Sequence, residues 1–285
     1  METAKITAAL EGAKAAGIDN IVALRGGAQR RRAPAALPAG RMRTRGRQRL
    51  IPPPPPPPRP PPPAPADPPA GQAEWTATDG GFSCALDLVK HIRAAHGDHF
   101  CLSVAGYPEG HPTVIKKIEP GRELSASEAR RVVTLDDGEY VCSDADYAGE
   151  LAYLKSKIDA GGDMILTQMF FDVDVFTQFV ADCRAAGITV PIVPGIMVIQ
   201  AYGGFKRMTA FCRSRVPAWI VDALAAVKDD EAAVKAEGIR IGTQMCRALL
   251  AAGVRGLHFY TLNLERVTFA IMKELGLLHG ELEAE

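Results

Sequence analysis

The chain has 285 residues, 47% of them apolar, which is enough for a substantial core in one large α/β domain or two small ones. It carries 33 Lys and Arg against 33 Asp and Glu, and this zero net charge gives no argument for binding nucleic acid or an acidic membrane. The six cysteines form no metal-ligand or disulfide pattern. Because no apolar leader or membrane-length stretch is present, we expect a cytoplasmic protein with reduced thiols.

The first part of the chain changes abruptly in composition. Residues 2–17 have the apolar spacing of a helix, and residues 20–25 that of a short buried strand. Residues 27–66 then form an arginine-rich stretch followed by a proline tract. Such a segment cannot build a packed core, so we expect it to be disordered or in the polyproline II conformation.

From residue 67 onward strands and helices alternate, which predicts a parallel sheet with right-handed crossovers. Together with residues 20–25 we count five parallel strands. No Gly-x-Gly-x-x-Gly motif opens a helix after a strand, which argues against a Rossmann dinucleotide site. The later predicted elements are a helix at 82–95, a strand at 99–106, a hairpin within 132–141 that turns at Asp137-Gly138, a helix at 145–160, a strand at 163–172, a helix at 175–186, a strand at 191–197, helices at 204–213, 218–227 and 231–252, a strand at 257–263 and a helix at 264–275.

The strand at 163–172 is the centre of this pattern. Its apolar run predicts burial on both faces, and the pair Thr167-Gln168 lies near its carboxyl end. Parallel α/β folds place their chemistry there, either on a (β/α) barrel face or on the crest of a doubly wound sheet. The Gln168 amide could bind a ligand, or it could be satisfied by neighbouring backbone, and this stretch alone does not decide between the two.

Several stretches together resemble the catalytic domain of methylenetetrahydrofolate reductases of plants and algae. Their order and spacing along the chain make the resemblance specific. The stretches are Asn20–Gly26, Gly80–Val89, Val104–Pro112, Ile165–Phe171, Pro191–Ile196 and Leu257–Asn263.

The resemblance implies a (β/α)₈ barrel of the TIM type, of which this chain contains about five β/α units, built from residues 1–26 and 67–278. It implies non-covalent FAD, NADH or NADPH as reductant, and reduction of methylenetetrahydrofolate to 5-methyltetrahydrofolate. The partners are then the folate and the nicotinamide cofactor, without nucleic acid or membrane, and a homo-oligomer is compatible with the family.

The resemblance also assigns roles to individual residues. Taken alone, Lys157 would be a solvated helix residue, His111 a loop histidine and Tyr260 a core strand residue. The implied substrate contacts are Gln168 and Tyr260; the implied flavin contacts are Arg25, Gly26, Asp67, Cys84, Ala85, Tyr107, His111, Glu150 (usually Asp in the family) and Lys157.

The chain departs from the family pattern in ways that bear on activity. The first strands of the family, with the Glu that acts as general acid, have no counterpart, so we expect a loss on the order of 10²–10⁴-fold in rate. Residues 27–66 interrupt an Arg-Gly-Asp-Pro-Pro motif, and we hypothesise a retained intron, with Asp67 as the catalytic aspartate. Residues 113–143 form a surface insertion and residues 279–285 a tail.

Two other functions compete with this interpretation. A non-catalytic interaction protein could bind RNA or a proline-recognising module through residues 27–66, but that segment has no aromatic residues for base stacking. An unrelated aldolase or decarboxylase of the barrel class would need a Schiff-base lysine at a strand end, and the sequence offers none.

Overall fold

A computed structural model of the protein describes residues 3–24, 81–82 and 84–278. The Arg/Pro-rich segment predicted at 27–66, and with it the proposed interaction function of that segment, lies outside the described residues. So do Arg25, Gly26, Asp67 and the tail at 279–285.

The described residues belong to two compact units. The first unit, residues 1–19 and 25–84, contributes helix α1 (Thr3–Ala15), which ends before Gly17 at a φ of 72°. Glycine adopts this left-handed conformation without steric cost, so the helix predicted at 2–17 ends where the sequence indicated. The second unit, residues 20–24 and 85–285, holds the strands and the remaining helices of the described chain.

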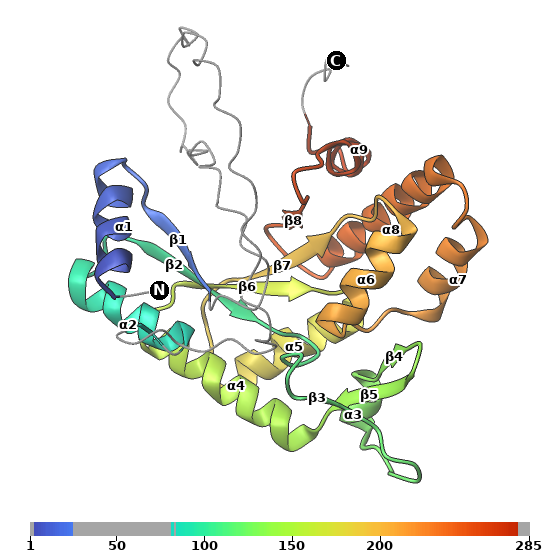
Figure 1. Ribbon diagram of the computed structural model, residues 1–285, viewed down its shortest axis with the longest axis horizontal. Helices are drawn as coiled ribbons and strands as arrows, with labels where there is room; N and C mark the ends of the chain where they lie inside the picture. Colours follow the sequence, from blue (N-terminus) through green and yellow to red (C-terminus); the bar gives the residue numbers. More distant parts are fainter. Residues whose placement is uncertain (1–2, 25–80, 83, 279–285) are drawn as a thin grey trace, which may run out of the picture. The chain divides into compact units, whose positions relative to one another are not determined.

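The second unit is organised around a parallel sheet of five strands in the order β1-β2-β6-β7-β8 (Figure 1). The strands are β1 (Asn20–Ala23), β2 (Cys101–Gly106), β6 (Met164–Met169), β7 (Ile192–Met197) and β8 (His258–Tyr260). Their order follows the chain from one edge to the other, whereas a doubly wound sheet reverses its strand order. The predicted parallel α/β class is confirmed, and the sheet is consistent with part of a (β/α) barrel.

Helices follow the strands as the apolar spacing predicted, with boundaries shifted by a few residues. Several helices begin at a side-chain cap: Ser143 accepts a hydrogen bond from the Asp146 amide, and Asp230 accepts from the Ala232 amide. The helices of this unit are α2 (Ala85–His96), α3 (Ala126–Arg130), α4 (Asp144–Asp159), α5 (Val173–Ala185), α6 (Tyr202–Cys212), α7 (Ala218–Ala226), α8 (Glu231–Ala251) and α9 (Arg266–Glu274).

The two faces of the sheet differ in burial. On the face toward α4 and α5, Val104 and Ile165 are fully buried, and a side chain at Gly106 would meet Phe179 of α5. On the opposite face Leu166 is half-buried and Val22 is 46% exposed. The prediction that the central strand is buried on both faces is therefore wrong, because the helices cover only one face of β2 and β6.

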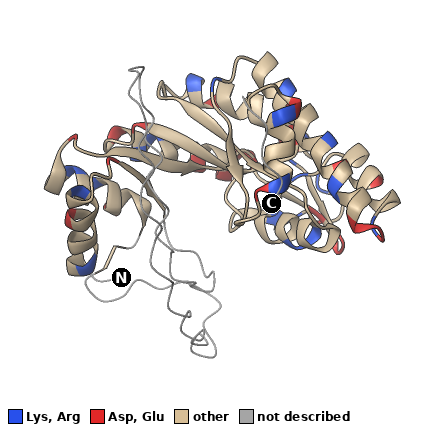
Figure 2. Ribbon diagram, turned by 90° about the horizontal axis from the view of Figure 1, so that it is seen from above, with Lys and Arg blue, Asp and Glu red and all other residues tan. Residues whose placement is uncertain are grey.

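Lys, Arg, Asp and Glu are absent from these five strands, and the charged residues of the described chain lie on other elements (Figure 2). The uncharged strands suit a sheet with one face buried under helices, since an unpaired buried charge is costly. Among the described helices, none combines the length and the apolar character needed to cross a membrane.

Strands β6 and β7 approach each other closely where their register shifts between Leu166 and Met169. The Gly195 amide donates to the hydroxyl of Thr167 at 2.9 Å. A Cβ at Gly195 would lie 2.2 Å from the Thr167 carbonyl oxygen, so this approach requires glycine.

Residues 113–143, here called the insertion module, form a small antiparallel sheet with α3. The sheet has the order β3-β5-β4 and consists of β3 (Ile115–Lys117), β4 (Val133–Leu135) and β5 (Gly138–Cys142). The predicted hairpin is present, but its turn is at 136–137, one residue before the predicted position. Sequence reasoning missed β3 and α3 because both are short, although Ser125 and Glu128 form a capping box that marks the start of α3.

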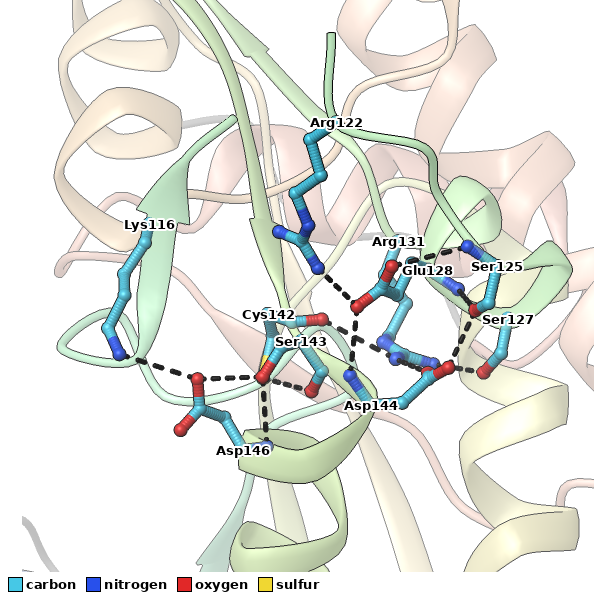
Figure 3. Close-up of polar contacts among 10 residues, drawn as sticks. All are labelled: Lys116, Arg122, Ser125, Ser127, Glu128, Arg131, Cys142, Ser143, Asp144 and Asp146. Carbon is cyan, nitrogen blue, oxygen red and sulfur yellow. Dashed lines mark hydrogen bonds and ion pairs between the residues drawn. The ribbon is translucent and has the colours of Figure 1, made fainter. Parts of the chain in front are cut away.

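A polar cluster joins the insertion module to the start of α4 (Figure 3). The buried Glu128 carboxylate pairs with Arg122 and accepts from the backbone amides of Ser125 and Asp144. The Arg131 guanidinium donates to the Asp144 carboxylate at 2.7 Å. Hydrogen bonds from Ser125 and Arg131 hold the pKa of Asp144 below its ordinary value. The cluster thereby fixes the amino end of α4.

We expect Arg131→Ala to lower the free energy of unfolding by about 2 kcal/mol, because the guanidinium is buried, bonds a charged carboxylate and lies over the Tyr147 ring. Urea denaturation followed by circular dichroism measures the change. Lys116→Ala is the control, since its exposed pair with Asp146 contributes less than about 0.5 kcal/mol. Equal losses in the two variants would contradict a structural role for the Arg131 cluster.

Candidate functional site

Polar side chains from separate strands meet the carboxyl-terminal edge of the parallel sheet. Tyr107 follows β2 directly, Gln168 is the penultimate residue of β6 and Tyr260 is the last residue of β8. Since the carboxyl ends of parallel strands share one edge, the fold brings these three sequence positions to the same side of the sheet (Figure 1).

The Gln168 side chain is half-buried and only partly satisfied by the protein. Its Oε1 accepts a hydrogen bond from the Met169 amide at 2.9 Å. Within the described chain this is the hydrogen bond that the side chain makes, which leaves the Nε2 group available as a donor. Neighbouring backbone therefore occupies the acceptor of Gln168, as one of the two interpretations expected, and the ligand-binding interpretation stays a prediction for its Nε2 group.

The Tyr260 hydroxyl makes a hydrogen bond to strand β6. It donates to the Thr167 carbonyl oxygen at 2.8 Å, which belongs to the peptide unit that precedes Gln168. Burial, with smaller effects from Tyr107 and Cys212, raises the pKa of Tyr260 to about 12. Tyr260 is thus a neutral side chain whose hydroxyl is already engaged by β6.

Lys157 of α4 points into the protein and is not a solvated helix residue. The side chain is buried, and its Nζ donates to the Ala105 carbonyl oxygen of β2 at 2.7 Å. With Glu150 and Tyr107 it lines a pocket of about 10 Å³, which has room for one water molecule. Burial raises the pKa of Glu150, and the charge of Lys157 opposes that shift.

His111 lies in the same loop as Tyr107 and packs against it. The two rings meet edge to face with 4.7 Å between their centroids. His111 Nδ1 is 2.7 Å from the Thr113 hydroxyl, a hydrogen bond that orients the imidazole ring. Tyr107, His111, Glu150 and Lys157 are therefore neighbours, joined by ring packing and by the pocket.

The remaining predicted site residues are less fully placed. Ala85 is the buried first residue of α2, and the half-buried Cys84 precedes it in the other compact unit. Arg25, Gly26 and Asp67 lie outside the described residues.

Sequence reasoning missed a buried ionic network beside this edge. Glu109, in the Tyr107–His111 loop, is only 4% exposed, and its carboxylate accepts from the Arg215 amide at 3.3 Å. The Arg215 side chain donates to the Asp172 carboxylate at 2.8 Å and to the Val132 carbonyl oxygen at 3.0 Å. The available signal was a carboxylate within the loop motif, but its partner is 106 residues away in the chain.

Burial, reinforced by the charge of Asp172, raises the pKa of Glu109 from 4.5 to about 8. The folded protein therefore retains a proton that the unfolded chain has already released between these pH values. The contribution of Glu109 to stability is therefore fully present below pH 4.5 and is lost as pH rises through about 8.

We expect Glu109→Gln to remove this pH dependence. The variant should be more stable than the wild type at pH 8 by an amount on the order of 2–4 kcal/mol, and the two should converge toward pH 5. Urea unfolding at a series of pH values measures the difference, with Glu119→Gln, at an exposed glutamate, as the control. Parallel pH profiles for all three proteins would show that Glu109 is ionised in the folded state.

Comparison with known proteins is consistent with this geometry. The sequence profile of the family described as "Methylenetetrahydrofolate reductase" matches residues 65–276. The chain is 50% identical over 212 residues to a "Probable methylenetetrahydrofolate reductase (NADH)" of Oryza sativa subsp. japonica, a match that covers 74% of this chain and 32% of that protein. A "Methylenetetrahydrofolate reductase (NADH) 1" of Zea mays is 49% identical over 212 residues, with the same coverage of 74% and 32%.

A bacterial relative extends the similarity. The "5,10-methylenetetrahydrofolate reductase" of Escherichia coli is 31% identical over 213 residues, which are 75% of this chain and 58% of that protein. The chain spans about a third of the length of its plant relatives. Because the family profile covers most of its residues, the chain belongs to the methylenetetrahydrofolate reductase family.

Proposed function

We propose that this chain acts in the FAD-dependent reduction of 5,10-methylenetetrahydrofolate to 5-methyltetrahydrofolate, with NADH as the source of hydride. Family membership supports the reaction class. The observation that carries the proposal is the cluster of Tyr107, Glu150 and Lys157 at the sheet edge that also bears Gln168 and Tyr260.

The surroundings of Lys157 suit an anionic dinucleotide. Its ammonium group lies at the carboxyl end of β2, where Nζ donates to the Ala105 carbonyl oxygen. A buried ammonium group favours a phosphate group as its ligand, through charge-assisted hydrogen bonds. The pocket itself has room for one water molecule only, so a dinucleotide would lie across its mouth, against Tyr107 and His111. When bound, FAD would supply the hydride-carrying chemistry that no side chain provides.

Gln168 and Tyr260 would act on the substrate side in different ways. The free Nε2 group of Gln168 can donate to a carbonyl oxygen or ring nitrogen of a pterin or nicotinamide. Tyr260, whose hydroxyl is engaged with Thr167, would contribute the face of its ring to stacking.

Residues predicted from the family pattern complete the proposed site, with Asp67 as the catalytic carboxylate. Each would contact the flavin through its side chain or backbone. They are Arg25, Gly26, Asp67, Cys84, Ala85 and His111.

NADH is the proposed reductant because the rice and maize relatives carry NADH in their names, and both are about half identical to this chain. NADPH is named for a relative in Caenorhabditis elegans that is 37% identical. Anaerobic bleaching of bound flavin by NADH, compared with NADPH at equal concentration, distinguishes the two.

We expect Lys157→Met to weaken FAD binding by at least about 10-fold, which corresponds to about 1.4 kcal/mol, because it removes the buried cation and keeps an unbranched side chain of similar length. Quenching of FAD fluorescence during titration with the full chain measures the affinity.

Lys155→Met is the matched control, since Lys155 lies on the same helix and pairs with Asp159 at the surface. Its affinity for FAD should stay within about 2-fold of the wild type. Failure of the wild-type chain to bind FAD would refute the proposed function, and equal binding by both variants would remove Lys157 from the site.

A further inference from the structure

The connection between α6 and α7 makes hydrogen bonds to the loop that carries Tyr107 and His111. This loop, residues 107–114, joins β2 to β3 and is called the β2–β3 loop. Arg213 Nη1 donates to the Pro112 carbonyl oxygen at 3.1 Å and also to the carbonyl oxygen of Ile115, where β3 begins. On the other side of His111, the Arg215 amide donates to Glu109. His111 is therefore bracketed by contacts from a segment about a hundred residues away in the chain.

The backbone conformation of Arg213 favours glycine, so the arginine at this position must be explained by the contacts of its side chain. Arg213 caps α6 in the left-handed conformation, with φ 49° and ψ 50°. Glycine is the residue that adopts this conformation without strain at the end of a helix. The backbone strain at Arg213 is offset by the contacts of its half-buried guanidinium. This group donates to two carbonyl oxygens and lies 5.0 Å from the centre of the Tyr140 ring.

We propose that Arg213 is a positioning residue that holds the β2–β3 loop in the conformation that presents Tyr107 and His111 to the flavin. This inference rests on the proposed function, because it assigns the loop to the cofactor site. The Nη1 group of Arg213 donates to two acceptors at once, so one side chain fixes both the end of the loop and the start of β3. A loop ordered in advance binds its ligand more tightly, since less conformational entropy is lost on binding.

A purely structural role for Arg213 predicts a different outcome from a positioning role. Arg213→Gly relieves the backbone strain while it removes the guanidinium, so the overall stability of the protein should change little. The order of the β2–β3 loop should decrease nevertheless. Loop order and global stability therefore separate in this variant, whereas a general loss of packing would lower both.

The matched control is Arg184→Ala. Arg184 Nη1 likewise donates to two carbonyl oxygens, those of Ile188 at 2.6 Å and Val190 at 3.0 Å. These acceptors precede β7, at the opposite edge of the sheet from the β2–β3 loop. The control thus removes the same kind of contact at a place remote from the candidate site.

The test is hydrogen–deuterium exchange of the full-length chain, read by mass spectrometry on peptides that span residues 107–115. The amides of Gly110 and Val114 report on the loop, because they donate to Tyr107 and His111 carbonyl oxygens at 3.0 and 2.9 Å. We expect exchange at these amides to be at least about 10-fold faster in Arg213→Gly, unchanged in Arg184→Ala, and intermediate in Arg213→Lys, which keeps the charge but lacks the planar guanidinium group. The urea midpoint of each variant confirms that it is folded.

FAD titration provides the second readout. Arg213→Gly should bind FAD about 10-fold more weakly than the wild type, and Arg184→Ala should match the wild type. Unchanged exchange in both Arg213 variants, or unchanged FAD affinity in Arg213→Gly, overturns the inference while the proposed function stands. Absence of FAD binding by the wild type refutes the proposed function instead, and loop exchange still decides whether Arg213 orders the loop.

Discussion

Parallel pairing of β2 with β6 is the constraint on which the rest of the structure depends. Ser103 pairs with Met164 and Gly106 with Thr167, so the two strands run side by side and end together. Parallel strands require a long crossover, and here α4 provides it. The crossover brings Lys157 into contact with β2 and places Gln168 at the same edge of the sheet as Tyr107. The insertion module extends that crossover, and its Arg131 and Glu128 fix the point at which α4 begins.

The edge of the sheet owes its polar character to loops that come from distant parts of the chain. The network of Glu109, Arg215 and Asp172 joins the loops after β2 and β6 to the connection between α6 and α7. Its guanidinium also reaches the insertion module at Val132. These contacts are buried or half-buried, so desolvation makes them strong but also sensitive to proton uptake and release.

The sequence was sufficient to predict the longer helices and strands, whose apolar residues recur at a regular spacing. The helices from α4 to α9 and the strands β2, β6 and β7 are predicted to within a few residues because each buries a regular face. Short elements with little apolar signal, such as β3, could not be predicted in this way. The family resemblance named Lys157, Gln168 and Tyr260, but only the structure shows that Lys157 is buried and that the Tyr260 hydroxyl is engaged. Contacts such as that between Glu109 and Arg215 produce no repeating pattern in the sequence, because the fold brings together residues that are far apart in the chain.

The glycine at position 195 lets two strands that do not pair touch each other. Tyr260 of β8 reaches the Thr167 carbonyl oxygen of β6 across β7, and its ring passes where a Cβ on Gly195 would lie, 2.5 Å from the ring edge. β8 pairs with β7 over three residues only, so this bond across the intervening strand is a substantial part of what anchors it. A side chain at position 195 would push the ring away and detach β8 from β6. The edge strand and the Gln168 peptide unit would then move independently of each other, although neither had been altered itself.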